Sequence, residues 1–118
     1  MLDLITRMAS SELQDSWRRT TEFLREARSH LSEAAEGVCS DEIAEFEDFL
    51  SHNELELALD SLEAALVKSP GESLRVFEFL VLAAENMRLE KHAARYRATI
   101  ASMRRGMEER WKERGTQS

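Results

Sequence analysis

The stretch ELELALDSLEAALVK, residues 54–68, decides the fold class of this chain. Its apolar side chains recur at steps of three and four residues, the period of a helix that buries one face. These side chains are Leu55, Ala58, Leu59, Leu62, Ala65 and Leu66. Ser69-Pro70-Gly71 follows and ends the predicted helix, because the residue before a proline disfavours helical backbone.

The chain on either side carries similar patterns. Ser40-Asp41-Glu42 opens a preceding helix over residues 40–51, with acids in the first turn where the helix dipole favours them. Residues 72–88 form a helix that is apolar nearly all round, which is typical of a helix central in a bundle or pressed against a partner. A last helix covers residues 90–113 and carries arginines on one side. Its other side is apolar and is predicted to face inward: Ala93, Tyr96, Ile100, Met103, Met107 and Trp111.

A long first helix is predicted from residue 11 to residue 37. Ser11-Glu12-Leu13-Gln14 matches a capping box, and Gly37 is a natural stop. Residues 2–9 either extend this helix or form a turn over the core. One stripe of apolar or small residues follows the helical period: Leu13, Trp17, Thr20, Leu24, Ala27, Leu31, Ala34 and Val38.

Turn-forming residues are rare in the 118-residue chain, which has one proline and four glycines. Several short strands need more turns than these residues provide, so the pattern favours helices joined by brief loops. We therefore predict an all-α protein, an antiparallel bundle of four to five helices. Residues 1–118 form a single domain, with frayed ends over 1–9 and 114–118.

Charge is distributed unevenly along the chain, whose formal net charge is -7. A negative net charge, and above all an acidic surface, repels nucleic acid and anionic lipid and attracts a basic partner. No lysine or arginine occurs within residues 29–67, which hold eleven acids: Glu33, Glu36, Asp41, Glu42, Glu45, Glu47, Asp48, Glu54, Glu56, Asp60 and Glu63. We predict no nucleic-acid partner.

Features of a membrane or secreted protein are not apparent. The longest apolar run, residues 79–84, is too short to cross a bilayer. Residues 1–7 lack the basic and apolar regions of a signal peptide. Cys39 is the only cysteine, so no internal disulfide is possible. These observations predict a cytoplasmic protein without a membrane partner.

Residues suited to catalysis are scattered. His30, His52 and His92 lie on different predicted elements and share no metal-ligand spacing. Cys39 lies beside a helix start, which is expected to lower the pKa of its thiol, but no base accompanies it. The chain has no glycine-rich phosphate loop and no nucleophile elbow. We predict no enzymatic activity, no cofactor and no metal.

Acids form two outward stripes on the helices over 40–51 and 54–68. A solvated helix face explains such stripes, but an ordinary exposed helix also carries lysine or arginine four residues away. The absence of these cations favours a basic partner. The predicted partner-binding residues are the two stripes and the turn between them: Asp41, Glu45, Asp48, His52, Asn53, Glu54, Glu56, Asp60 and Glu63.

The passage EFEDFLSHNELELALDSL, residues 45–62, resembles small bacterial immunity proteins of the MafI type and related families. They share an apolar-aromatic helix, a His/Asn/Glu turn and a second helix like this one. An apolar helix ending in a Met-x-Leu step is matched at Met87-Arg88-Leu89, so the likeness covers roughly residues 41–90. It implies a protein that binds and blocks a cognate polymorphic toxin, often a nuclease. An exposed Trp17 or Trp111 would serve as an anchor for such a partner, although helical periodicity favours a core position for both rings.

A structural or adaptor bundle is the alternative. Such a protein acts through homo- or hetero-oligomerisation, and the apolar helix over 72–88 is the surface expected to serve it. A homodimer is among the predicted partners, and a stable homodimer that charge reversal at Asp41, Glu45 and Asp48 leaves unaffected favours this alternative.

Overall fold

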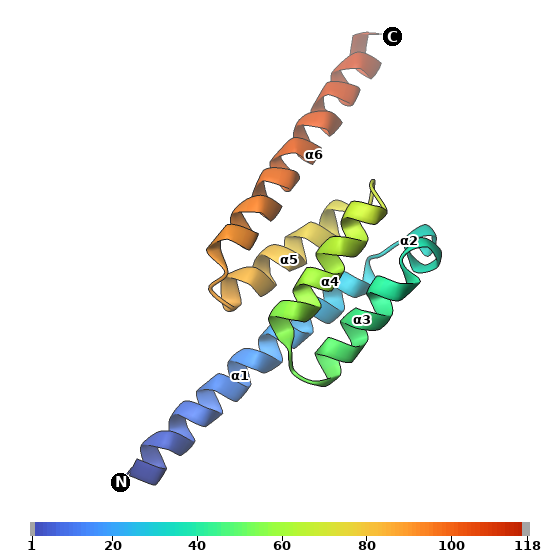
Figure 1. Ribbon diagram of the computed structural model, residues 1–118. Coiled ribbons are helices and arrows are strands. Elements are labelled where there is room, and N and C mark those ends of the chain that lie inside the picture. Colours follow the sequence, from blue (N-terminus) through green and yellow to red (C-terminus); the bar gives the residue numbers. More distant parts are fainter. Residues whose placement is uncertain (1, 117–118) are drawn as a thin grey trace.

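The computed structural model describes the backbone of residues 2–116 and the side chains of residues 11–115 (Figure 1). Within this part of the chain the secondary structure is entirely helical, which confirms the all-α fold class. The six helices are α1 (Leu2–Ser29), α2 (Glu33–Val38), α3 (Ser40–Ser51), α4 (Leu55–Lys68), α5 (Leu74–Asn86) and α6 (Glu90–Thr116).

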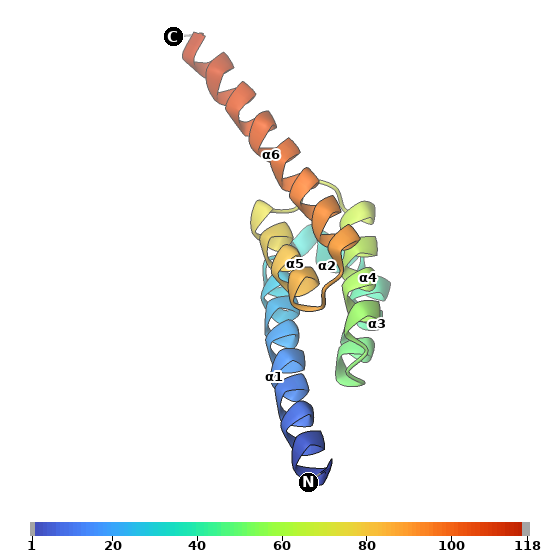
Figure 2. The same cartoon turned by 90° about the vertical axis from the view of Figure 1, so that its left-hand side faces the viewer.

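The helices pack as two groups around one core. Helix α5 lies between α1 and α6 and runs antiparallel to both, while α3 and α4 form an antiparallel hairpin on the other side (Figures 1 and 2). Five helices contribute fully or nearly fully buried side chains to one cluster, among them Leu24, Phe46, Leu62, Leu80 and Tyr96. Helix α5 is therefore central, one of the two settings that its apolar sequence predicts.

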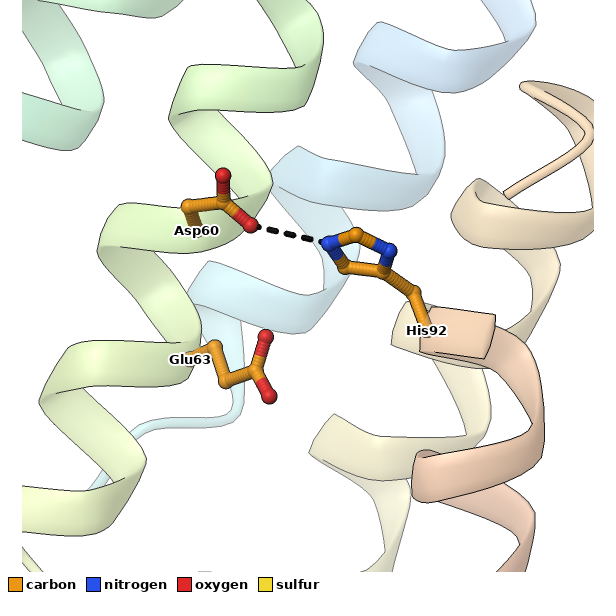
Figure 3. A group of neighbouring side chains, drawn as sticks. All are labelled: Asp60, Glu63 and His92. Atoms are coloured by element: carbon orange, nitrogen blue, oxygen red, sulfur yellow. Dashed lines mark hydrogen bonds and ion pairs between the residues drawn. The ribbon is translucent and has the colours of Figure 1, made fainter. Parts of the chain in front are cut away.

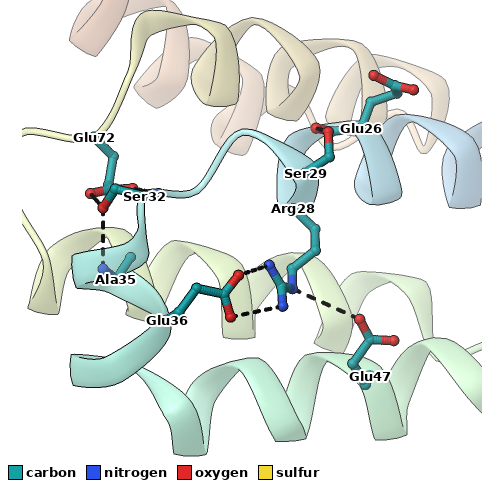
Figure 4. A network of polar contacts seen from close by, with 8 residues as sticks. All are labelled: Glu26, Arg28, Ser29, Ser32, Ala35, Glu36, Glu47 and Glu72. Carbon is teal, nitrogen blue, oxygen red and sulfur yellow. Dashed lines mark hydrogen bonds and ion pairs between the residues drawn. The ribbon is translucent and has the colours of Figure 1, made fainter.

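The predicted first helix extends through residues 2–9, one of the two alternatives for that segment, but its predicted end at Gly37 is wrong. Helix α1 begins at Leu2 and ends at Ser29, and α2 follows after a short break. Ser32 caps α2, since its hydroxyl accepts a hydrogen bond from the Ala35 amide at 3.1 Å. The carboxylate of Glu72, only 7% exposed, accepts from the Ser32 amide and hydroxyl, both at 2.7 Å (Figure 4). A contact forty residues away thus stabilises a break that contains no glycine or proline.

Gly37 lies inside α2 and does not end it. The chain instead turns at Cys39, the residue between α2 and α3, whose thiol donates to the Ala65 carbonyl at 3.3 Å. Burial raises the pKa of this thiol, and the Glu42 carboxylate raises it further, so the expectation of a lowered pKa is wrong. The break between α1 and α2 divides the predicted first helix in two, so the described chain has six helices where four to five were predicted.

Two helices end in the same backbone motif. Asn53 after α3 and Arg88 after α5 have φ values of 57° and 59°, the left-handed region. In each case the amide of the following residue donates a hydrogen bond to a carbonyl in the last turn of the helix. Glu54 donates to Phe49 and Leu89 donates to Ala84, both at 2.9 Å. These bonds define Schellman motifs, which satisfy carbonyls at the helix end.

Two long helices project from the body at opposite ends, and the molecule measures 72 × 28 × 20 Å (Figures 1 and 2). Leu13 and Trp17 on α1 are 50% and 39% exposed, and Met107 and Trp111 on α6 are 44% and 76% exposed. Their predicted inward positions are wrong because each helix is longer than the body that it packs against.

Helical backbone continues through residues 2–9 and 114–116, while residues 1, 117 and 118 lie outside the described part. None of the helices in that part combines the length and the apolar character needed to span a membrane.

Candidate functional site

Tertiary contacts neutralise part of the acidic segment. Lys68 pairs with Glu42, with 3.1 Å between Nζ and Oε1. Arg28 on α1 forms a forked pair with Glu36 and lies 3.9 Å from Glu47, between the two carboxylates (Figure 4). The partners of these acids come from outside residues 29–67. The sequence argument from missing cations is therefore wrong for these acids.

Asp60 and Glu63, predicted to face a partner, instead face α6 (Figure 3). Asp60 Oδ1 lies 3.0 Å from Nε2 of His92. Both Glu63 oxygens accept from Arg95 at 3.1 Å, and one also accepts from the Tyr96 hydroxyl at 2.9 Å. Partial burial by itself raises the pKa of Glu63, but the hydrogen bonds from Arg95 and Tyr96 outweigh it and hold the pKa below its usual value.

Asp60, Glu63 and His92 form the one group in the described chain in which a histidine and two carboxylates have the spacing of cation ligands. The ligand atoms of Asp60, Glu63 and His92 all lie within 4.8 Å of one another. A cation bound there would compete with the Arg95 guanidinium, which already donates to both Glu63 oxygens. The arrangement is complete as an ion-pair network, so its evident role is to position α6 on α4.

A smaller group of acids keeps no cation partner among the residues that the structure describes. Asp41 and Glu45 on the outer side of α3, and Glu54 and Glu56 at the start of α4, are exposed. Asp48 continues the α3 stripe and has only histidine nearby. We call the following set the acidic hairpin surface: Asp41, Glu45, Asp48, His52, Asn53, Glu54 and Glu56.

His52, a member of this surface, is the C-cap residue of α3. Its Nδ1 lies 2.8 Å from the backbone carbonyl of Asp48 and 3.7 Å from the Asp48 carboxylate. The contact with the carbonyl raises the pKa of His52, and the carboxylates of Asp48 and Glu54 raise it further. The positive charge on this imidazole therefore persists to a higher pH than in an isolated histidine, inside an otherwise negative surface.

The acidic hairpin surface lies on a rigid support. Phe46 and Leu50 hold α3 to the core, and Leu55 and Ala58 do the same for α4. Asn53 makes the tight turn between the helices, with an amide that donates to the Leu50 carbonyl at 3.1 Å. Carboxylates on packed helices keep their spacing when a partner approaches, so little ordering is needed on binding.

The two tryptophans occupy different places. Trp17 lines a groove of about 560 Å³ together with Leu13 and Glu56, so it adjoins one member of the acidic hairpin surface. Trp111 lies in the last turns of α6 and is 76% exposed. The C-terminal end of that helix projects away from the α3–α4 hairpin (Figure 1). Sequence periodicity placed both rings in the core, and the only sequence signal for their exposure is the unusual length of the two end helices.

Comparison of the chain with protein-family models, with curated proteins and with solved structures gives no match.

Proposed function

We propose that this chain is an immunity protein that binds a cognate basic toxin through the acidic hairpin surface and blocks it. The observation that carries the proposal is that the fold pairs some acids of residues 29–67 with basic side chains and leaves others without an ion pair. Five acids of residues 29–67 have basic partners from elsewhere in the fold: Glu36, Glu42, Glu47, Asp60 and Glu63. Within the described residues Asp41, Glu45, Glu54 and Glu56 of the acidic hairpin surface form no ion pair, and outside that surface the same holds for Glu33 on α2. A basic partner relieves the repulsion between these like charges.

Occlusion is the mechanism that such a surface supports. A nuclease holds phosphates in a basic site, and a rigid acidic helix pair occupies a site of that charge without turnover. Complementary charge also speeds association, which matters for an inhibitor that has to act before its toxin does. The likeness of residues 45–62 to immunity proteins supports the toxin class, and the same residues form most of the acidic hairpin surface.

The test uses a charge reversal with a matched control. In the variant Asp41→Lys/Glu45→Lys, two exposed acids of the acidic hairpin surface are reversed. In the control Glu22→Lys/Glu26→Lys, two exposed acids of α1 are reversed, so the net charge changes equally. The binding partner tested is a candidate toxin chosen from the genes next to this one, and affinity is measured at low and high salt.

We expect the hairpin variant to bind at least about tenfold more weakly, roughly 1.4 kcal/mol, and to lose protection of co-expressing cells. The control changes affinity much less, because only long-range steering is affected. Continued killing despite soluble co-expression of the unaltered chain overturns the proposal for that toxin. Equal effects of the two variants overturn the assignment of the surface.

An adaptor role through oligomerisation is the second candidate function. The two projecting helices favour it, because their exposed apolar side chains have no evident use in a monomer.

A further inference from the structure

The molecule exposes more surface than a compact chain of its mass. Its accessible surface is 8218 Å², whereas a monomeric protein of 13.6 kDa exposes about 6,600 Å². The Cα radius of gyration is 17.5 Å, compared with about 13.5 Å for a compact domain of this length. The excess surface, about 1,600 Å², is twice the roughly 800 Å² that each partner contributes to a standard protein interface.

Exposed apolar side chains lie on the projecting halves of α1 and α6. The apolar stripe that buries Tyr96 in the core continues along α6 beyond the body and becomes progressively more exposed. Its members follow the helical period: Ala93, Tyr96, Ile100, Met103, Met107 and Trp111. Leu13 and Trp17 mark the corresponding exposed stripe on α1. Isolated exposed apolar residues are ordinary, but a stripe continuous with a core indicates a covered face.

The two projecting segments carry opposite charge. Residues 2–17 hold Asp3, Glu12 and Asp15 against Arg7, a formal charge of -2. Residues 101–116 hold five basic and three acidic residues, a formal charge of +2. Pairing α1 of one copy with α6 of another therefore joins complementary charges, whereas pairing two α6 helices brings two positive segments together.

We infer that a second copy of this chain covers both segments in a two-fold dimer. The projecting half of α1 in one protomer packs antiparallel against the projecting half of α6 in its partner. Because the two segments point to opposite ends of the molecule (Figure 1), a copy turned end for end aligns both pairs at once. Such a contact closes on itself, as two-fold interfaces do.

Open grooves lie where each segment leaves the body. One, of about 560 Å³, adjoins Leu13 and Trp17 on α1. The other, of about 610 Å³, adjoins Leu74, Met103 and Met107 beside α6. Each has an apolar wall and space for the side chains of an incoming helix. The inference goes beyond the proposed function and does not rest on it.

The first experiment measures mass by light scattering during size-exclusion chromatography over a range of protein concentrations. We expect the full chain at twice 13.6 kDa and the variant Trp111→Glu at the single mass. The matched control is Val38→Glu, since Val38 is 52% exposed on α2, a helix that packs on α3 and α4. We expect this control to remain a dimer, with circular dichroism confirming the helical content of both variants.

A single mass for the unaltered chain at every concentration overturns the inference, and so does a dimer that Trp111→Glu leaves intact. Cross-linking then tests the pairing. In a Cys39→Ala background, the variants Leu13→Cys and Met107→Cys are treated with a bismaleimide, each separately and as a mixture. We expect cross-linked dimers only in the mixture, and efficient cross-linking of Met107→Cys with itself overturns the α1–α6 pairing.

Discussion

Asn53 and Arg88 occupy the same left-handed position after a helix, but their side chains suit it differently. Asparagine tolerates positive φ better than other residues with a Cβ, whereas arginine meets the steric cost in full. We predict that Arg88→Gly raises the free energy of unfolding by about 0.5–1 kcal/mol, after allowing for the extra freedom of glycine in the unfolded chain. Urea denaturation measures the change.

The control for that prediction is Asn53→Gly, which relieves less strain and is expected to raise stability less. A lower stability of Arg88→Gly contradicts the prediction and indicates that the arginine side chain makes contacts worth more than the relief of strain.

His52 provides a second test at the residue scale. Its raised pKa means that the protonated imidazole is favoured in the folded state. This contribution to stability is present below the ordinary histidine pKa of about 6.5 and disappears as the pH rises through the folded value. We predict that an NMR titration of the ring finds a pKa above the ordinary value, and that Asp48→Asn shifts it downward. No shift in that variant means that the carboxylate makes no contribution.

At the scale of elements, the contact between α4 and α6 depends more on Glu63 than on Asp60. Tyr96 is 2% exposed, and truncation of Glu63 leaves its hydroxyl without an acceptor. We predict that Glu63→Ala lowers the free energy of unfolding by about 1–3 kcal/mol. Asp60 is more exposed than Glu63, with side-chain exposures of 49% and 28%, and Asp60→Ala is expected to cost less than about 1 kcal/mol. Equal costs contradict this ranking.

The pH dependence of this contact has the opposite sign to that of His52. The pKa of Glu63 is lowered, so its contribution to stability is present above the ordinary carboxyl pKa of about 4.3. The contribution decreases as the pH falls through the folded value. The difference in unfolding free energy between the unaltered chain and Glu63→Ala therefore narrows in acid, which urea denaturation at a series of pH values measures.

At the scale of the whole molecule, one core joins the α1–α5–α6 group to the α3–α4 hairpin. Leu62 is fully buried in that core. We predict that Leu62→Ala lowers the free energy of unfolding by about 2–5 kcal/mol. In a Trp111→Phe background, Trp17 fluorescence reports on α1 and circular dichroism on all helices. The two signals are expected to change at the same urea concentration, as in two-state unfolding. An earlier fluorescence transition contradicts a single cooperative unit.

The candidate site was predictable only in part. The register of residues 40–51 correctly places Asp41, Glu45 and Asp48 on an exposed side, because outward direction on a helix follows from spacing. The same spacing predicts an outward Glu63, but it cannot show that α6 crosses there with Arg95 and Tyr96. Charge compensation between distant elements is not a property of local sequence.

The sequence by itself determined the all-α class and helices α3 to α6 to within a few residues, because helical periodicity, Pro70 and the acidic first turns act over short distances. Only the tertiary structure decided the break before α2, which a buried Glu72 stabilises from forty residues away. It also decided which acids remain unpaired and that Trp17 and Trp111 lie outside the core, because both outcomes depend on which helices meet and where the body ends.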